Sequence, residues 1–109
     1  PTAVCCVSDV VAIGAMHALR KHNITPGIDV SVIGYDGLEI GKYVEPPLTT
    51  IIQPRKETGK QIAKKIIQLI ETGQDPKEIQ ELLDAKILRR GTDNPPLAEK
   101  QENEIHSQK

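Results

Sequence analysis

The chain has 109 residues, enough for one domain at most. Its 14 lysines and arginines against 15 aspartates and glutamates give a formal net charge of −1, so no overall basic field is available to attract nucleic acid. No run of about 18 apolar residues is present, which argues against a membrane-spanning helix. The first residues lack the charged segment of a secretory signal, and two cysteines fit a reducing compartment. We therefore expect a cytoplasmic protein with no membrane association.

The first predicted elements are a short strand and a longer helix. The apolar run at residues 3–7 indicates a buried strand, and a helix follows from Ser8-Asp9 to about His22. Ser8 is a favoured N-cap residue, and Asp9 places negative charge where the helix dipole is positive. Capping accounts for Ser8 fully, so a ligand contact would be a second role for this residue.

The apolar residues of this helix fall on two stripes. One stripe follows the spacing i, i+3, i+4, i+7 and is expected to face a sheet; its members are Ala12, Ala15, Met16 and Leu19. The second stripe consists of Val10, Ile13, Gly14 and His17. A one-sided surface helix has no use for Val10 and Ile13, so we expect this stripe to meet another domain or subunit. Scattered surface apolar residues are the ordinary alternative.

The strand predicted at residues 30–33 is the element around which the rest of the predicted fold is organised. It is apolar on both faces, as strands are in parallel sheets that helices cover on each side. Gly34 lets the backbone leave the strand, and Tyr35 and Asp36 follow. Ligands of such sheets bind beyond the carboxyl ends of the strands, where Asp36 would offer two oxygens to the hydroxyls of a sugar or ribose. Asp36-Gly37 is also common in turns, and local chemistry alone favours the turn.

The next elements are predicted at residues 38–43, a helical turn, and at residues 48–52, a third strand. Arg55–Thr72 is a strongly periodic helix that ends at Gly73. Its apolar stripe consists of Gly59, Ile62, Ala63, Ile66, Ile67 and Ile70, and we expect close packing to explain the glycine.

Residues 81–88 predict a final strand, and residues 92–109, which are almost entirely polar, are expected to form a disordered tail. The elements together predict an α/β fold with a βαβ unit and a mostly parallel sheet. Two substantial helices cannot cover both faces of three or four strands. The chain is therefore expected to be part of a larger α/β protein or of an intertwined assembly.

Several blocks of this sequence occur together in one known family. They are Pro1-Thr2-Ala3-Val4, Ser8-Asp9, Ala12-Ile13-Gly14-Ala15, the segment Asp29–Asp36, Tyr43, and the segment Pro46–Pro54 followed by Gly59. In these blocks the chain resembles the lactose-repressor/galactose-repressor (LacI/GalR) family of bacterial transcription regulators. The resemblance implies the C-terminal part of a periplasmic-binding-protein-like effector domain, in which two α/β lobes enclose a small effector.

The resemblance also implies how the chain is divided. Residues 1–50 would be the later part of the second lobe, and residues 51–54 would cross between the lobes. Residues 55–91 would be the C-terminal helix and strand of the first lobe, and residues 92–109 the tail.

Individual residues match functional positions of the family. Asp36 matches an aspartate that accepts hydrogen bonds from effector hydroxyls, which reverses the preference for a simple turn. Ser8 matches a polar contact position, where asparagine is commoner and serine is shorter. Gln53 matches a position that lines the cleft, and Tyr35 beside Asp36 completes the expected effector set. The expected dimer interface consists of Val10, Ile13, His17 and Tyr43.

The implied partners are a small effector, a sugar or related polyol, and a second copy of the chain. The family's helix-turn-helix has no counterpart in this sequence, so DNA would be reached only through a domain outside this chain. A fragment of a periplasmic sugar-binding protein of a transporter is the alternative, because such proteins share the fold. An enzyme is not expected, because no nucleophile is paired with a base. Cys5 and Cys6 are expected to pack as small hydrophobes, with no metal or cofactor.

Overall fold

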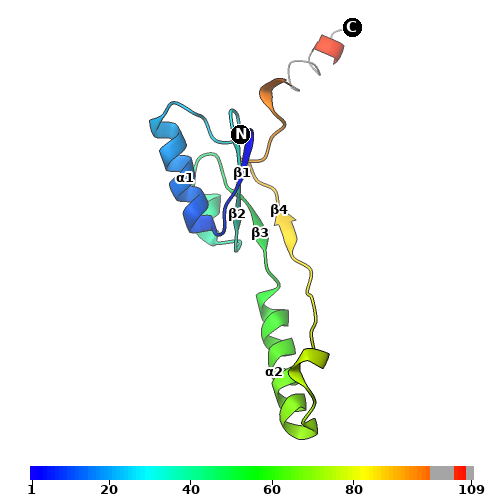
Figure 1. Cartoon of the computed structure of the whole chain (residues 1–109). Coiled ribbons are helices and arrows are strands. Elements are labelled where there is room, and N and C mark those ends of the chain that lie inside the picture. Colours follow the sequence, from blue (N-terminus) through cyan, green and yellow to red (C-terminus); the bar gives the residue numbers. More distant parts are fainter. Residues whose placement is uncertain (99–104, 108–109) are drawn as a thin grey trace. The chain divides into compact units, whose positions relative to one another are not determined.

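The computed structural model describes residues 1–98 and 105–107 of the chain (Figure 1). The chain divides into two compact units. Residues 1–52 and the described residues from 86 onward form the first unit, and residues 53–85 form the second. The boundary between Ile52 and Gln53 falls within the crossover predicted at residues 51–54. The assignment of the units to lobes stays a prediction.

A four-stranded sheet lies at the centre of the first unit. In spatial order its strands are β1 (Ala3–Cys5), β2 (Ser31–Tyr35), β3 (Thr49–Ile52) and β4 (Lys86–Leu88). The first three strands are parallel, with Ala3 opposite Ser31 and Ile33 opposite Thr49, whereas β4 is antiparallel to β3. This mostly parallel sheet with its βαβ unit confirms the predicted α/β fold. β1 is shorter than the strand predicted at residues 3–7.

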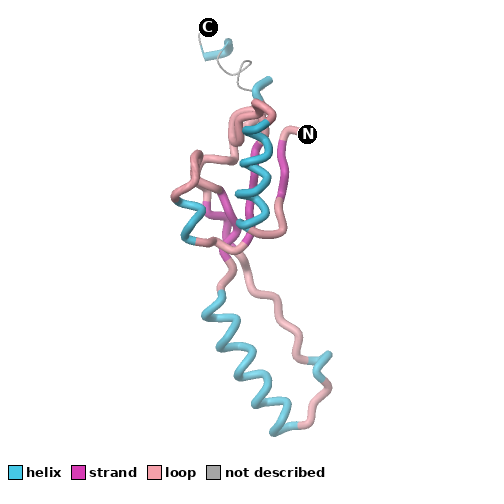
Figure 2. The backbone as a smooth tube through the Cα atoms, turned by 90° about the vertical axis from the view of Figure 1, so that its left-hand side faces the viewer, coloured by secondary structure: helices cyan, strands magenta, loops and turns pink. Residues whose placement is uncertain are grey.

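The helix α1 (Asp9–Lys21) joins β1 to β2 and lies alongside the sheet (Figures 1 and 2). The stripe predicted to face the sheet does so: Ala12 and Met16 are fully buried and form the core with Val32 and Leu48. After β2, the helical turn predicted at residues 38–43 is present as a 3-10 helix at Glu39–Lys42. The core therefore joins α1 to β2, the strand that Asp36 follows.

The last strand is joined to the first unit. The backbone of β4 pairs with β3, with Ile87 opposite Ile51. The sequence predicts this strand at residues 81–88, and the family resemblance groups it with the preceding helix in residues 55–91. The bounds are corrected, because only Lys86–Leu88 forms strand. This strand pairs with β3 and belongs to the sheet unit, and its assignment to a lobe stays a prediction. The position of a short strand depends on the strand with which it pairs, and β4 pairs with β3.

The packed part of the chain extends beyond β4, which corrects the predicted start of the tail. Thr92 is fully buried. Its hydroxyl donates to the Val32 carbonyl at 2.6 Å and accepts from the Thr49 amide at 2.9 Å, so it links β2 to β3. The polar composition predicted disorder, but these polar groups fill backbone hydrogen bonds of the sheet. Of the rest of the predicted tail, residues 99–104 and 108–109 lie outside the described residues.

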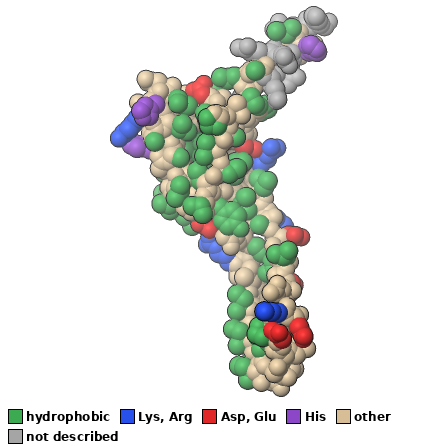
Figure 3. All heavy atoms as spheres, in the orientation of Figure 1, with side chains coloured by type: hydrophobic (Ala, Val, Ile, Leu, Met, Phe, Trp, Pro, Cys, Tyr) green, Lys and Arg blue, Asp and Glu red, His purple; other side chains and the backbone are tan. Residues whose placement is uncertain are grey.

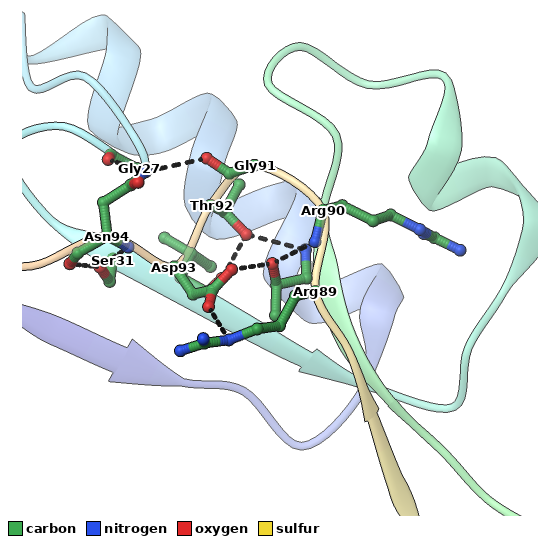
Figure 4. A network of polar contacts seen from close by, with 10 residues as sticks. Gly27, Ser31, Arg89, Arg90, Gly91, Thr92, Asp93 and Asn94 are labelled. Carbon is green, nitrogen blue, oxygen red and sulfur yellow. Dashed lines mark hydrogen bonds and ion pairs between the residues drawn. The ribbon is translucent and has the colours of Figure 1, made fainter.

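The two residues after Thr92 are also fixed by hydrogen bonds (Figure 4). The Asp93 carboxylate accepts from the Thr49 hydroxyl at 2.5 Å and from the Arg89 guanidinium at 2.7 Å. The side-chain amide of Asn94 donates to the Gly27 carbonyl at 2.6 Å. Residues 89–94 are therefore anchored to the ends of β2 and β3.

The second unit consists of α2 (Arg55–Thr72), a 3-10 turn at Pro76–Glu78 and an extended return. The bounds of α2 are those predicted, and Gly73 ends the helix with a φ of +64°, which glycine adopts without strain. The ammonium of Lys65 lies 3.1 Å from the Glu81 carboxylate. None of the helices in the described part of the chain is long and apolar enough to cross a membrane.

Apolar side chains run along one side of α2 (Figure 3). In the described part of the chain no residue of α2 is buried, and its isoleucines are more than half exposed: Ile62, Ile66, Ile67 and Ile70. The close packing expected at Gly59 is absent from the described residues, because a Cβ built there has no neighbour within 4 Å. The stripe predicted for α2 thus exists but is uncovered.

Candidate functional site

The carboxyl ends of three parallel strands define the candidate site. β1, β2 and β3 run in the same direction, so their carboxyl ends lie at one edge of the sheet. Ser8 comes soon after β1, Asp36 directly after β2 and Gln53 directly after β3. Ser8 and Asp36 belong to the first unit, whereas Gln53 begins the second, and the part of Gln53 in the site stays a prediction. In α/β sheets this is the edge at which ligands bind.

Ser8 occupies the N-cap position of α1, as predicted. Its backbone is extended, and its hydroxyl accepts a hydrogen bond from the Val11 amide at 3.3 Å. Its carbonyl accepts from the Ala12 amide at 3.0 Å. The hydroxyl is therefore used by the helix, and its contact with an effector stays a prediction.

Tyr35 and Asp36 form the exit from β2. Tyr35 is the last residue of the strand and lies opposite Ile51 of β3. Asp36 is partly buried, and its φ of +123° lies in a region that residues other than glycine seldom adopt. Gly37 also has a positive φ, so the chain turns here as the Asp-Gly pair predicts. The effector contact of Asp36 stays a prediction.

Asp9 lies at this edge of the sheet as well, although its sequence neighbours indicate only a helix-capping role. Its side chain is fully buried at the start of α1. One carboxylate oxygen accepts from the Thr50 hydroxyl at 2.5 Å, and the other accepts from the Leu38 amide at 2.6 Å. The helix-dipole argument explains an acid at this position, but it does not predict partners from two other segments.

Gly34 is the one residue of β2 whose type could have indicated that Asp9 packs against this strand. A Cβ on Gly34 would collide with an oxygen of the Asp9 carboxylate. β2 continues through Gly34 to Tyr35, so the prediction that Gly34 lets the backbone leave the strand is wrong. The glycine is needed because a buried carboxylate packs directly against the strand.

The residues predicted for a dimer interface differ in exposure. Val10 is 66% exposed and Tyr43 is 75% exposed, and His17 is also exposed. Ile13 is partly buried and packs against the core, so part of its side chain belongs to the fold of the unit itself. The assignment of all four to an interface stays a prediction.

Two groups of the first unit have shifted pKa values. Burial, with a contribution from neighbouring Cys5, raises the pKa of the Cys6 thiol. The hydrogen bond from Lys42 and its charge lower the pKa of the Glu39 carboxyl, with the two groups 2.8 Å apart. Among the residues that the structure describes, no group of three or more His, Cys, Asp or Glu could hold a metal ion.

Comparisons with known proteins agree with this arrangement of strands. The sequence profile of the periplasmic binding protein-like domain family matches residues 1–92. The chain is 39% identical over 89 residues to the HTH-type transcriptional repressor PurR of Vibrio parahaemolyticus. The matched stretch covers 82% of this chain and 27% of the repressor. It is 43% identical over 70 residues to the ribose operon repressor of Haemophilus influenzae, which covers 64% of this chain and 21% of that repressor.

A similar fold occurs in a solved structure, the lac repressor dimer bound to operator and the anti-inducer ONPF. The TM-score is 0.70, with 32% sequence identity over 84% of this chain and 27% of that chain. The chain thus spans about a quarter of the length of the relatives it matches. These relatives are named as transcriptional repressors.

Proposed function

The chain belongs to the periplasmic binding protein-like domain family, in the form found in regulators of the LacI/GalR family, and from this premise we propose that it supplies part of an effector-sensing domain. Its ligand would be a sugar or a related polyol. The sensing domain would be completed by residues outside this chain, since the chain spans about a quarter of its relatives.

The position of Asp36 carries this proposal. It follows the central parallel strand β2 directly, and it shares the carboxyl edge of the sheet with Ser8 after β1. A carboxylate accepts hydrogen bonds from two or more hydroxyls at once, which is the property a polyol site requires. Asp36 would therefore be the main acceptor, with Ser8, Tyr35 and Gln53 as further contacts.

The mechanism would be a shift between lobe arrangements. An effector that binds the closed lobes more tightly than the open ones would shift the population toward the closed form. Because the two binding equilibria are linked, the effector would change operator affinity by the same coupling free energy with which operator changes effector affinity. Operator binding itself would come from a domain outside this chain.

The same proposal includes a homodimer and a cytoplasmic location. The ribose operon repressor and PurR are named as repressors, and the lac repressor structure is of a dimer bound to operator. For this chain, Val10, Ile13, His17 and Tyr43 would contribute to the dimer contact. No catalytic step is assigned to it.

Isothermal titration calorimetry on the complete effector-binding domain that contains this chain tests the proposal. The ligands would be D-ribose, D-glucose, lactose and cellobiose, with hypoxanthine as a ligand that has no sugar hydroxyls. We expect at least one sugar to bind, and Asp36→Asn to lower its affinity about tenfold or more, because hydrogen bonds to a charged acceptor are the stronger ones. Asparagine tolerates a positive φ, so this variant keeps the backbone.

Asp29→Asn is the matched control. Asp29 comes before β2, at the opposite end of the strand, and its carboxylate accepts from the Thr25 amide at 2.6 Å. The Asp29→Asn variant removes one carboxylate charge from the same unit and should leave sugar affinity unchanged. Binding of hypoxanthine but no sugar, or equal sugar affinity with and without Asp36→Asn, would contradict the proposal.

A further inference from the structure

We propose that Asp9 is a positioning residue for the effector site and acts through Thr50 and Leu38 on the backbone that presents Asp36. The inference rests on the proposed function, because a positioning role requires that Asp36 contacts an effector. Asp9 itself would touch no effector. Its part is to hold the loop at residues 36–38 in one conformation.

Three consecutive amides of this loop donate to three different acceptors. The bonds run from Asp36 to the Ile51 carbonyl (2.9 Å), from Gly37 to the Thr50 hydroxyl (3.2 Å) and from Leu38 to the Asp9 carboxylate (2.6 Å). Two of the acceptors are on β3 and the third is on α1. The loop is therefore attached at successive residues to β3, which pairs with β2, and to α1, which packs against it.

A single hydroxyl connects these attachments. Thr50 donates to Asp9 at 2.5 Å and accepts from the Gly37 amide, so Asp9, Thr50 and the amides of Gly37 and Leu38 form one network, which we term the Asp9 brace. Asp9 and Thr50 are both fully buried. Hydrogen bonds to a buried carboxylate are strong, and removing a partner leaves polar groups without compensation. The brace is thus a stiff connection between α1 and the loop.

The backbone conformation of Asp36 requires such a connection. Its φ of +123° is unfavourable for a residue with a Cβ, and a conformation of this kind persists only where the surroundings hold it. Relaxation of φ would redirect the side chain, because the Cα–Cβ bond turns with the backbone. The brace begins on the residue next to Ser8, so it also fixes the Asp36 loop relative to Ser8 at the start of α1. Binding sites need such groups held within about 0.5 Å.

Gly34 supports the same interpretation. A Cβ at this position would displace the Asp9 carboxylate, so the sequence of β2 leaves space for the brace at the strand residue two positions before Asp36. An acid that served only the helix dipole could remain at the surface and would require no glycine in the neighbouring strand.

Thr50→Val and Thr50→Ser form the first test, in the 109-residue chain itself. Valine has nearly the shape of threonine but no hydroxyl, whereas serine keeps the hydroxyl. We expect the amides of Gly37 and Leu38 to exchange with solvent faster in Thr50→Val than in Thr50→Ser, relative to the amides of β2. Unchanged exchange at these two amides in Thr50→Val would overturn the brace.

The second test is a double-mutant cycle on the complete effector-binding domain, with the tightest-binding sugar of the panel named above. Thr50→Val should lower affinity about tenfold, and Thr50→Ser should stay within about twofold of wild type. Asp36→Asn should then cost at least about threefold less in the Thr50→Val background than in wild type, because a misplaced carboxylate has less affinity to lose. Effects that multiply independently would overturn the inference.

Two further variants separate positioning from general stability. Val32→Ala removes buried core volume without touching the brace, so it should lower stability but leave sugar affinity unchanged; a loss equal to that of Thr50→Val would overturn the inference. Asp9→Asn keeps one carbonyl acceptor for Leu38. If Thr50→Val does not fold, Asp9→Asn takes its place in the cycle with the same expected non-additivity.

The outcomes distinguish the two proposals. If wild type binds no sugar of the panel, the proposed function fails and the positioning role fails with it. If wild type binds and Asp36→Asn weakens binding while Thr50→Val does not, the proposed function stands and the positioning role alone is overturned.

Discussion

At the scale of single residues, a carboxylate buried at the start of a helix determines what the neighbouring strand can carry. Asp9 lies against β2 at Gly34, and the side chain of Leu48 also packs close to this glycine. Any side chain at Gly34 would have to displace one of them. This single contact connects the amino-acid choice in the strand to the conformation of the loop that follows it.

Gly34→Ala is therefore expected to lower the free energy of unfolding by about 1–3 kcal/mol, the usual cost of forcing an atom into a packed interior. Gly14→Ala is the matched control, because a Cβ at Gly14 meets no atom within 4 Å and the residue lies within α1. It should raise stability by about 0.5–1 kcal/mol. Urea unfolding followed by circular dichroism measures both; a neutral Gly34→Ala would contradict the packing described at Asp9.

The two cysteines should react at different rates. Burial raises the pKa of the Cys6 thiol, so less of the reactive thiolate is present at neutral pH, whereas Cys5 is exposed. We expect iodoacetamide to modify Cys6 in Cys5→Ser several times more slowly than Cys5 in Cys6→Ser, with the difference shrinking as pH rises. Mass spectrometry over time measures the rates. Equal rates at neutral pH would show that Cys6 is not protected.

The role of a residue could be predicted from the sequence where its type and its immediate neighbours determine that role. Ser8 caps a helix and Asp36 turns the chain after a strand, and both follow from residue type and neighbours. Asp9 and Thr92 could not be assigned in this way, because their partners are distant in sequence: Thr50 for one, and Val32 and Thr49 for the other. A polar residue in a polar stretch indicates solvent unless the fold is known.

At the scale of elements, α2 and β4 mark the limits of pattern-based prediction. The repeat of isoleucines over Arg55–Thr72 gave the helix with the observed bounds, because many residues carry the same periodic signal. β4 has three residues and no such signal. Its position depends on pairing with the edge of β3, which is a property of the folded sheet.

The uncovered stripe of α2 predicts a helix of low local stability. Ile66 and Ile70 are 52% and 79% exposed, so α2 gains little from burial in this chain, and most helical stability in proteins comes from packing. In native-state hydrogen exchange, the amides of α2 should exchange at least about a hundredfold faster than those of β2. Equal protection of both elements would mean that the stripe is covered, for instance by self-association, which a dilution series would detect.

At the scale of the whole molecule, surfaces left open by the fold indicate what is missing from the chain. β1 is at one edge of the sheet, and an apolar groove of about 270 Å³ lies beside it, lined by residues of β1, α1 and the loop after α1. Parallel sheets are normally covered on both faces. The groove and the stripe of α2 agree with the prediction that the complete domain contains further α/β layers.

Dimerisation should depend on the exposed apolar residues predicted for the interface. Val10→Lys and Tyr43→Lys are expected to weaken self-association of the complete effector-binding domain about tenfold or more, because each places a charge where the predicted interface would bury an apolar contact. Ile28→Lys is the control, since Ile28 is 52% exposed and outside the predicted interface. Sedimentation velocity measures the dimer fraction. An equal effect of all three variants would remove the interface assignment.

The central claim is that the carboxylate after β2 lines an effector cleft to which this chain contributes one wall. A crystal structure of the complete effector-binding domain with a bound sugar tests it most directly. We expect an Asp36 carboxylate oxygen about 3 Å from a sugar hydroxyl, at the edge of the sheet where β1 and β2 end. A sugar bound elsewhere, with the Asp36 side chain directed into bulk solvent, would contradict it.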